Sequence, residues 1–142
     1  MIDKRRRAIH NQRGRTMPTT AAKLREYIAQ ANGFETHYRH SLTGMSYSEG
    51  VKHVAEEAGA YWLIDAILIS SKCRRLQQKC AGLEFWTLTV KDKAAVLTCT
   101  DGGIGGEKEN VVYTQQIEFS DFPLNMITLY NDAGILCLPG ER

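Results

Sequence analysis

A run of almost entirely apolar residues, 59–69, constrains the fold of this chain more than any other segment. It reads Gly-Ala-Tyr-Trp-Leu-Ile-Asp-Ala-Ile-Leu-Ile, and it is too short to cross a bilayer as a helix, which takes about 20 apolar residues. A short helix that is apolar on all sides is typical of the centre of a globular core. The run therefore predicts a buried central helix.

Asp65 is the one charged residue of this run. A carboxylate in such a helix must be paired, hydrogen-bonded, protonated or exposed at an edge, because burying an uncompensated charge is costly. Asp65 can serve a structural purpose by accepting hydrogen bonds, or it can belong to an acid–base site. The members of that site would be Asp65, His53, Tyr61 and Glu56. No nucleophile elbow, metalloprotease helix or dinucleotide fingerprint accompanies them, which favours the structural interpretation.

The first helix is predicted directly after a pair of threonines. Thr19 or Thr20 can cap it, because a threonine hydroxyl accepts a hydrogen bond from a free N–H group of the first turn. Apolar residues then recur at helical spacing, and Asn32 and Gly33 are typical of a helix end.

Two more helices follow in the sequence. Ser46 and Glu49 fit the Ser-x-x-Glu capping box, and apolar residues recur at i, i+3, i+4 and i+7 from Val51 onward. Gly59 ends or bends this second helix before the apolar run begins. The third helix can continue, with more polar residues, through positions 72–78.

The second half of the chain has the alternating pattern of β-strands. Strands are expected at residues 85–90, 94–100, 111–119, 126–130 and 135–138. Helices first and strands afterwards, joined by short links, predict an α+β fold. We expect about three N-terminal helices packed on a roughly five-stranded antiparallel sheet, in a single domain over residues 18–142.

Residues 1–17 form a basic segment outside this domain. Their net charge is +5, whereas that of the whole chain is +2. Residues 18–142 are therefore mildly acidic, with a net charge of −3. The segment is expected to be disordered, and it is either an upstream extension ahead of Met17, a solvated tail or a nucleic-acid-binding arm. The candidate phosphate contacts are Arg5, Arg6, Arg7, Arg13 and Arg15.

Cysteine usage and composition indicate a cytoplasmic protein. The chain has 142 residues, of which 43% are hydrophobic, enough for one domain with a real core. Its four cysteines form no Cys-x-x-Cys pair, and no secretory signal precedes them, so we expect reduced thiols. Cys99 and Cys137 are interpreted as small core residues.

Neither a phosphate loop nor a metal site is predicted. Residues 101–106 are rich in glycine, but they lead into a strand and not into a helix N-terminus, so they are interpreted as a hairpin connection. His37, His40, His53 and Cys73 complete no recognised zinc spacing. No cofactor is expected.

Aromatic residues are expected mainly in the core. The predicted anchors are Trp62, Phe85, Trp86, Tyr113, Phe119 and Phe122. Since neighbouring strand residues face opposite ways, either Phe85 or Trp86 must point outward and could mark a partner surface. The candidate partner contacts are Trp86, Glu107 and Glu109. An edge strand could also pair two copies of the chain into a homodimer.

The apolar run, together with the segment before it, resembles an uncharacterised family of short proteins encoded by bacteria and their mobile elements. The resemblance extends over roughly residues 24–139, and the run 59–67 is its distinctive part. Other matching segments are Tyr38-Arg39-His40, Phe85-Trp86, Leu97-Thr98-Cys99, Val112-Tyr113, Asp121-Phe122-Pro123-Leu124 and Leu129-Tyr130. The resemblance implies a fold and no activity, and residues 72–83 look less typical of it.

Three classes of function are carried forward. The leading one is a non-enzymatic interaction protein from a mobile element that binds a host protein or nucleoprotein, with anti-CRISPR-like inhibition as its concrete form. The second is a nucleic-acid-binding accessory protein that uses the basic tail. The third is a small enzyme built around Asp65 and His53. No membrane association is expected for any of them.

Overall fold

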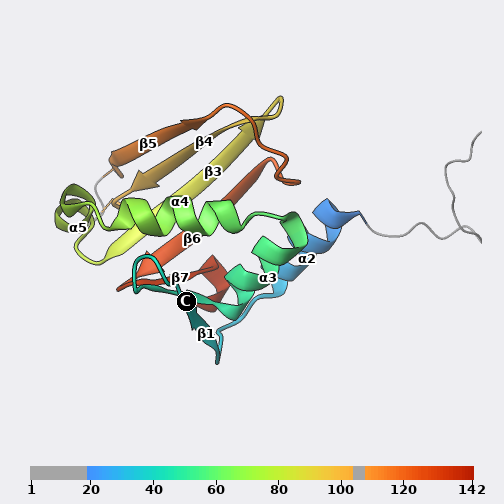
Figure 1. Cartoon of the computed structure of the whole chain (residues 1–142), viewed down its shortest axis with the longest axis horizontal. Coiled ribbons are helices and arrows are strands. Elements are labelled where there is room, and N and C mark those ends of the chain that lie inside the picture. Colours follow the sequence, from blue (N-terminus) through green and yellow to red (C-terminus); the bar gives the residue numbers. More distant parts are fainter. Residues whose placement is uncertain (1–18, 104–107) are drawn as a thin grey trace, which may run out of the picture.

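The computed structural model describes residues 19–103 and 108–142, which form four α-helices and one seven-stranded sheet. The strand order is β1-β2-β7-β6-β3-β4-β5. Figure 1 shows α4 lying across the sheet, with α5 beyond one end of it and α3 and α2 beyond the other. The predicted α+β class is confirmed, whereas three helices and five strands were too few. Within the described residues no helix is long and apolar enough to span a bilayer.

The first two helices begin at hydroxyl caps. Helix α2 (Thr20–Gln30) is capped by Thr19, whose Oγ1 accepts a hydrogen bond from the N–H of Ala22 at 3.0 Å. Helix α3 (Glu49–Ala58) is capped by Ser48, whose Oγ accepts from the N–H of Val51 at 3.1 Å. The predicted cap at Ser46 is wrong, because Ser46 is held in the sheet two residues earlier.

The apolar run forms helix α4 (Tyr61–Ser71). Gly59 ends α3 as predicted, in a left-handed conformation with φ of 63° that glycine adopts without strain. The predicted continuation through residues 72–78 is wrong, because the chain becomes extended at Cys73 and starts a separate helix, α5 (Arg74–Cys80). This break lets α5 pack against strands of the sheet instead of extending α4 past its edge.

The five predicted strands are confirmed, with ends that differ by a few residues. They are β3 (Leu83–Lys91), β4 (Ala94–Thr100), β5 (Val111–Ile117), β6 (Met126–Asp132) and β7 (Ile135–Cys137). All pairings among them are antiparallel. On the face away from α4, Thr128, Thr87, Thr98 and Thr114 stand opposite one another in a row across four strands. Such cross-strand threonine pairs stabilise a sheet face exposed to water.

Two short strands were not predicted. β1 (His37–Arg39) and β2 (Ser46–Ser48) pair with each other antiparallel, and β2 pairs with β7 in parallel. The sheet is therefore mixed and not wholly antiparallel. Its two edges are β1 and β5, of which β5 is the longer.

The core lies between α4 and the inner face of the sheet. Leu63, Ile67 and Val54 are buried as expected, and Trp86 is completely buried. Trp62 is only half-buried, as are Ala58 and Ala66. Phe119 was also expected to be a core anchor, and this prediction is wrong. Its side chain is 68% exposed, because β5 ends at Ile117 and the chain bends at residue 118.

The C-terminal residues are tied to the start of α3. The 3₁₀ turn η2 (Pro139–Glu141) buries Glu141, whose Oε1 accepts from the hydroxyl of Ser48 at 2.5 Å and from the N–H of Leu138 at 2.8 Å. Its Oε2 accepts from the N–H of Gly50 at 3.0 Å. The negative charge thus sits at the positive end of the α3 dipole.

Candidate functional site

Asp65 lies on the outer side of α4, not in the core. Its side chain is 53% exposed, and Oδ1 lies 2.7 Å from Nε2 of His40, which is only 7% exposed. Asp65 was expected to be paired, hydrogen-bonded, protonated or exposed at an edge. It is both hydrogen-bonded and exposed. Its partner comes from the residues just after β1.

His40 joins this helix to the turn between β1 and β2. Nδ1 of His40 lies 2.8 Å from Oγ1 of Thr43, and that oxygen also accepts from the N–H of Met45 at 3.2 Å. The turn is closed by backbone hydrogen bonds between His40 and both Met45 and Gly44. Both ring nitrogens of His40 are therefore engaged, and the Asp65–His40–Thr43 chain braces the turn against α4.

The acid–base set that the sequence offered as an alternative to a structural Asp65 is not brought together. His53 stacks on Tyr27 of α2, with ring centroids 4.0 Å apart. Tyr61 donates to Glu56 at 3.2 Å, and Glu56 also accepts from Lys52 at 2.8 Å, a hydrogen bond that lowers the pKa of the Glu56 carboxyl. The predicted set is wrong as a unit, because His40 and not His53 lies beside Asp65.

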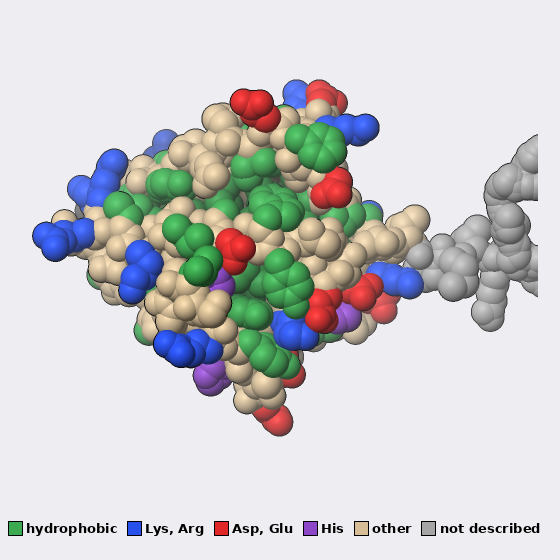
Figure 2. Space-filling model, in the orientation of Figure 1, with side chains coloured by type: hydrophobic (Ala, Val, Ile, Leu, Met, Phe, Trp, Pro, Cys, Tyr) green, Lys and Arg blue, Asp and Glu red, His purple; other side chains and the backbone are tan. Residues whose placement is uncertain are grey.

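Exposed apolar side chains surround Asp65. Leu42 is 72% exposed in the β1–β2 turn, and Ile69 and Tyr61 are 50% and 41% exposed on α4. Tyr61, Asp65 and Ile69 are spaced four residues apart, which places them on one side of the helix. Figure 2 shows hydrophobic side chains gathered along α4 around a carboxylate. The α4 surface is defined here as Leu42, Tyr61, Trp62, Asp65, Ala66 and Ile69.

Of the predicted partner contacts, Trp86 is wrong. Trp86 is 0% exposed on the inner face, so it cannot contact another protein. Phe85 takes the outward position and is covered by Tyr130, at 4.8 Å between ring centroids, and by the backbone of Gly102. Glu109 is exposed and accepts from the hydroxyl of Thr100 at 3.2 Å. Glu107 lies outside the described residues.

The basic tail, with Arg5, Arg6, Arg7, Arg13 and Arg15, also lies outside the described residues. The structure does reveal a second basic region, at the end of α4 and along α5. Its exposed cations are Lys72, Arg74, Arg75 and Lys79. In the described residues these four side chains take part in none of the ion pairs. Figure 2 shows Lys and Arg side chains gathered at the α5 end of the molecule.

The cysteines are free thiols in different environments. Cys73 is exposed, whereas Cys80, Cys99 and Cys137 are buried. Burial raises the pKa of all three buried thiols, that of Cys137 to about 11. The core positions predicted for Cys99 and Cys137 are confirmed.

Over residues 19–103 and 108–142, no three histidine, cysteine or acidic side chains gather as metal ligands.

The glycine-rich segment connects β4 and β5, as predicted. Asp101 closes its base, because its carboxylate accepts from the N–H of Gly103 at 3.1 Å and from the N–H of Asn110 at 2.9 Å. These hydrogen bonds lower the pKa of the Asp101 carboxyl. The segment leads into a strand, and residues 104–107 lie outside the described part.

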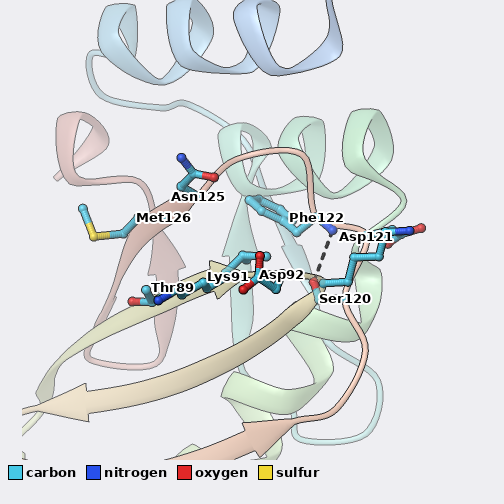
Figure 3. Close-up of a pocket in the computed structure, with 10 residues that line it drawn as sticks. Thr89, Lys91, Asp92, Ser120, Asp121, Phe122, Asn125 and Met126 are labelled. Carbon is cyan, nitrogen blue, oxygen red and sulfur yellow. Dashed lines mark hydrogen bonds between the residues drawn. The ribbon is translucent and has the colours of Figure 1, made fainter.

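A broad open hollow lies at the other end of the sheet. It has a volume of about 820 Å³ and lies between the β3–β4 turn and the corner before β6. In Figure 3 the ring of Phe122 points into it, while Asp121 points away. Ser120 Oγ accepts from the N–H of Phe122 at 3.2 Å, and charged residues of both signs, Lys91, Asp92, Lys93 and Asp121, line the hollow.

A buried polar cluster was missed by sequence reasoning. Glu84 of β3 is 5% exposed and hydrogen-bonds to Ser71, Trp86 and Asn131, all buried themselves. The alternation of β3 carried the signal, because Glu84 has the same parity as Trp86 and Leu88 and so must share their inward face. The sequence signal for this cluster is therefore a charged residue at an inward-facing strand position.

The fold therefore defines a small α+β protein with a mixed sheet and an exposed apolar helix surface. The chain belongs to DUF6876, a family of unknown function, whose model matches residues 22–142. This agrees with the expected resemblance to an uncharacterised family, which begins after the basic segment. Comparison with curated proteins and with solved structures gives no match.

Proposed function

We propose that this protein is a non-enzymatic interaction protein that binds another protein through the α4 surface. Three of the six exposed large apolar side chains in the described residues, Leu42, Tyr61 and Ile69, belong to this surface. Contiguous exposed apolar groups with polar neighbours are typical of protein-binding sites. This concentration of apolar side chains around one carboxylate is the observation that carries the proposal.

Asp65 gives the surface a specific polar contact. Its Oδ1 is engaged by His40, whereas Oδ2 takes part in none of the hydrogen bonds of the described residues. A lysine or arginine of the partner can reach this oxygen from the solvent side, since the Asp65 side chain is 53% exposed beside the apolar members of the surface. A charged hydrogen bond enclosed by apolar contacts contributes specificity as well as affinity.

The same geometry argues against an enzyme at this position. Asp65, His40 and Thr43 are connected as an acid, a base and a nucleophile would be, but the ring of His40 is only 7% exposed and joins the β1–β2 turn to α4. Thr43 would be the nucleophile of such a site, but its hydroxyl accepts the N–H of Met45 within a tight turn. The chain of hydrogen bonds resembles a triad in its residue types and connections, and its place within a tight, hydrogen-bonded turn favours a structural role.

The proposed partner is a bacterial host protein or nucleoprotein, and the concrete form is inhibition of a defence complex in the manner of anti-CRISPR proteins encoded by mobile elements. The net charge of −3 on residues 18–142 supports this form, because an acidic domain complements the basic nucleic-acid site of such a complex. The apolar surface would then provide the main part of the binding free energy.

The test compares two matched substitutions in capture experiments from bacterial lysate, followed by affinity measurements with the purified candidate. Ile69→Glu places a charge on the α4 surface, and Val111→Glu places the same charge on the β5 edge, at a residue 60% exposed against 50% for Ile69. We expect Ile69→Glu to weaken binding at least tenfold and Val111→Glu to leave it unchanged, because a buried unpaired carboxylate is costly only where the partner covers it.

Two results would contradict the proposal. A partner bound equally well by Ile69→Glu does not use the α4 surface. A partner lost equally with both variants responds to the added charge itself and not to its position. Melting curves of both variants control for unfolding, since both residues are already exposed and their substitution is expected to change stability little.

A second candidate function is nucleic-acid binding. The observation that favours it is the group of exposed cations at the end of α4 and along α5, which join none of the ion pairs of the described residues and add to the basic residues 1–17. Basic side chains bind phosphates with strong salt dependence and without sequence preference.

A further inference from the structure

Glu84 is a buried acidic residue, and among the described residues only one of its carboxyl oxygens is engaged. Oε1 lies 2.6 Å from the hydroxyl of Ser71, 2.8 Å from Nε1 of Trp86 and 3.3 Å from Nδ2 of Asn131. Oε2 takes part in none of the hydrogen bonds of the described residues. Glu141, the other buried glutamate, differs in this respect, because both of its oxygens accept hydrogen bonds.

The Glu84 carboxylate borders a small hollow. The hollow has a volume of about 240 Å³ and lies where the end of α4, α5, Met45 and the β6–β7 turn meet. Its lining residues include Ser71, Gln77 and Asn131. Ligand sites for whole small molecules have volumes of roughly 300–1,000 Å³, so this hollow suits a single functional group.

Among the described residues, no cationic side chain pairs with Glu84. The lining contains no lysine, arginine or histidine, and among the described residues Glu84 belongs to none of the ion pairs. A buried carboxylate without a cation is unfavourable, and the two usual remedies are protonation or a bound cation. Three donors converge on Oε1, which leaves Oε2 as the oxygen without a donor among the described residues.

We propose that the hollow beside Glu84 binds a primary ammonium group. An ammonium is a compact charge that needs one strong acceptor, which Oε2 provides, together with weaker acceptors in the lining. A guanidinium instead prefers to engage both oxygens of a carboxylate side by side, and here Oε1 is already occupied by three donors. The site therefore selects ammonium over guanidinium. The group comes either from a free amine or from a lysine side chain of another protein.

Trp86 supplies a local readout, because its indole N–H donates to the same carboxylate. The experiment is an NMR titration of ¹⁵N-labelled protein that follows this N–H resonance, with a Trp62→Phe variant to assign it. The probes are methylammonium, guanidinium and tetramethylammonium chlorides at equal millimolar concentrations. We expect a saturable shift with methylammonium, at least tenfold weaker binding of guanidinium, and no saturable shift with tetramethylammonium, which has no N–H to donate.

Two variants separate the Glu84 site from general effects of buried acids. Glu84→Gln keeps the shape and an acceptor oxygen but removes the charge, and it should weaken methylammonium binding at least tenfold. Glu141→Gln removes the charge of the other buried glutamate and should leave the affinity unchanged. If Glu84→Gln does not fold, the comparison of the three salts on the unmodified chain still decides.

The proposal is overturned by the absence of a saturable methylammonium shift, by equal shifts with all three salts, or by a shift that persists in folded Glu84→Gln. A further titration with N-acetyl-lysine methylamide distinguishes the two sources. Binding at least as tight as that of methylammonium assigns the site to a protein lysine, and exclusion of this derivative assigns it to a free amine. The site lies apart from Asp65, so it can fail or succeed independently of the function proposed for the α4 surface.

Discussion

At the scale of single residues, similar side chains in this protein have very different surroundings. Trp62 and Trp86 both lie in segments that read as apolar, yet Trp86 is fully buried under α4 and Trp62 is half-buried on its flank. Glu84 and Glu141 are both buried acids, yet only Glu141 has donors on both oxygens. The identity of a residue alone does not give its role, because the role depends on neighbours that are distant in the sequence.

The tryptophan pair gives a prediction about stability. Trp86→Ala should lower the free energy of unfolding by about 3–5 kcal/mol, because it leaves a cavity in the core and removes a hydrogen bond to buried Glu84. Trp62→Ala should lower it by roughly 1–3 kcal/mol, since less of the ring leaves water on folding. Urea denaturation followed by circular dichroism measures both. Equal losses for the two variants would contradict the assigned burial.

At the scale of elements, sequence patterns were reliable where a segment's own residues decide its structure. Strand β4 (Ala94–Thr100) has the predicted ends, because regular alternation and a tight turn before it specify both. Strands β1 and β2 were missed, because each has three residues and is held by a pairing with a distant segment. The break at Cys73 was missed because no glycine or proline marks it.

The same distinction between local sequence and distant contacts applies to the candidate site. The position of Asp65 on an apolar helix could be predicted from periodicity, and so could the inward direction of Glu84. The pairing of Asp65 with His40 could not, because it depends on how the β1–β2 turn folds back over α4. His53 was the nearer histidine in the sequence, but it lies on α3 and stacks against α2.

The junction of η2 with α3 gives a prediction at this scale. A Cβ atom at Gly50 would lie 2.3 Å from Oε2 of Glu141, so Gly50→Ala must displace this carboxylate from the helix start. We expect a loss of about 1–3 kcal/mol in the free energy of unfolding, as for other overpacked sites. The measurement is chemical denaturation with full-length protein.

The control is the double substitution. Without the Glu141 side chain the clash is absent, and alanine is favoured over glycine in helices by roughly 0.5–1 kcal/mol. Gly50→Ala should therefore be neutral or stabilising in a Glu141→Ala background, a reversal of sign that a double-mutant cycle detects. If Gly50→Ala is equally destabilising in both backgrounds, the close contact with Glu141 is not its cause.

At the scale of the whole molecule, charge is distributed unevenly. Basic residues concentrate in the first 17 residues and around α5, whereas the chain from residue 18 onward is acidic overall. The family match begins at residue 22, so the fold shared with the family does not include the basic segment. Two basic stretches of the sequence could thus contact phosphates, and their contributions can be measured separately.

Deletion of residues 1–16 tests the first of them. The described helices and strands begin at Thr20, so the melting temperature should stay nearly unchanged. Any affinity for duplex DNA should vanish, because the deletion removes six cations, and each phosphate contact contributes about −0.9 to the slope of log K against log salt. Filter binding at several salt concentrations measures the affinity for duplex DNA and its salt slope. A thermal melt measures the melting temperature.

The matched variant is Arg74→Ala with Arg75→Ala in the full chain. It should leave duplex binding almost unchanged if the first segment carries the contacts. Tight binding that survives the deletion and is lost in this variant would assign the contacts to α5 and contradict the role given to residues 1–17.

The parallel pairing of β2 with β7 has a consequence for how the molecule is made. Ser46 lies beside Ile135 in the sheet, and Ser48 hydrogen-bonds to Glu141, 93 residues later in the chain. A ribosome releases residues 46–48 long before residues 135–141, so for most of the time of synthesis β2 and the start of α3 lack their partners. The apolar α4 segment also leaves the ribosome before strands β3–β7. It therefore stays exposed to solvent until the sheet that covers it is complete. During that interval we expect it to depend on chaperones.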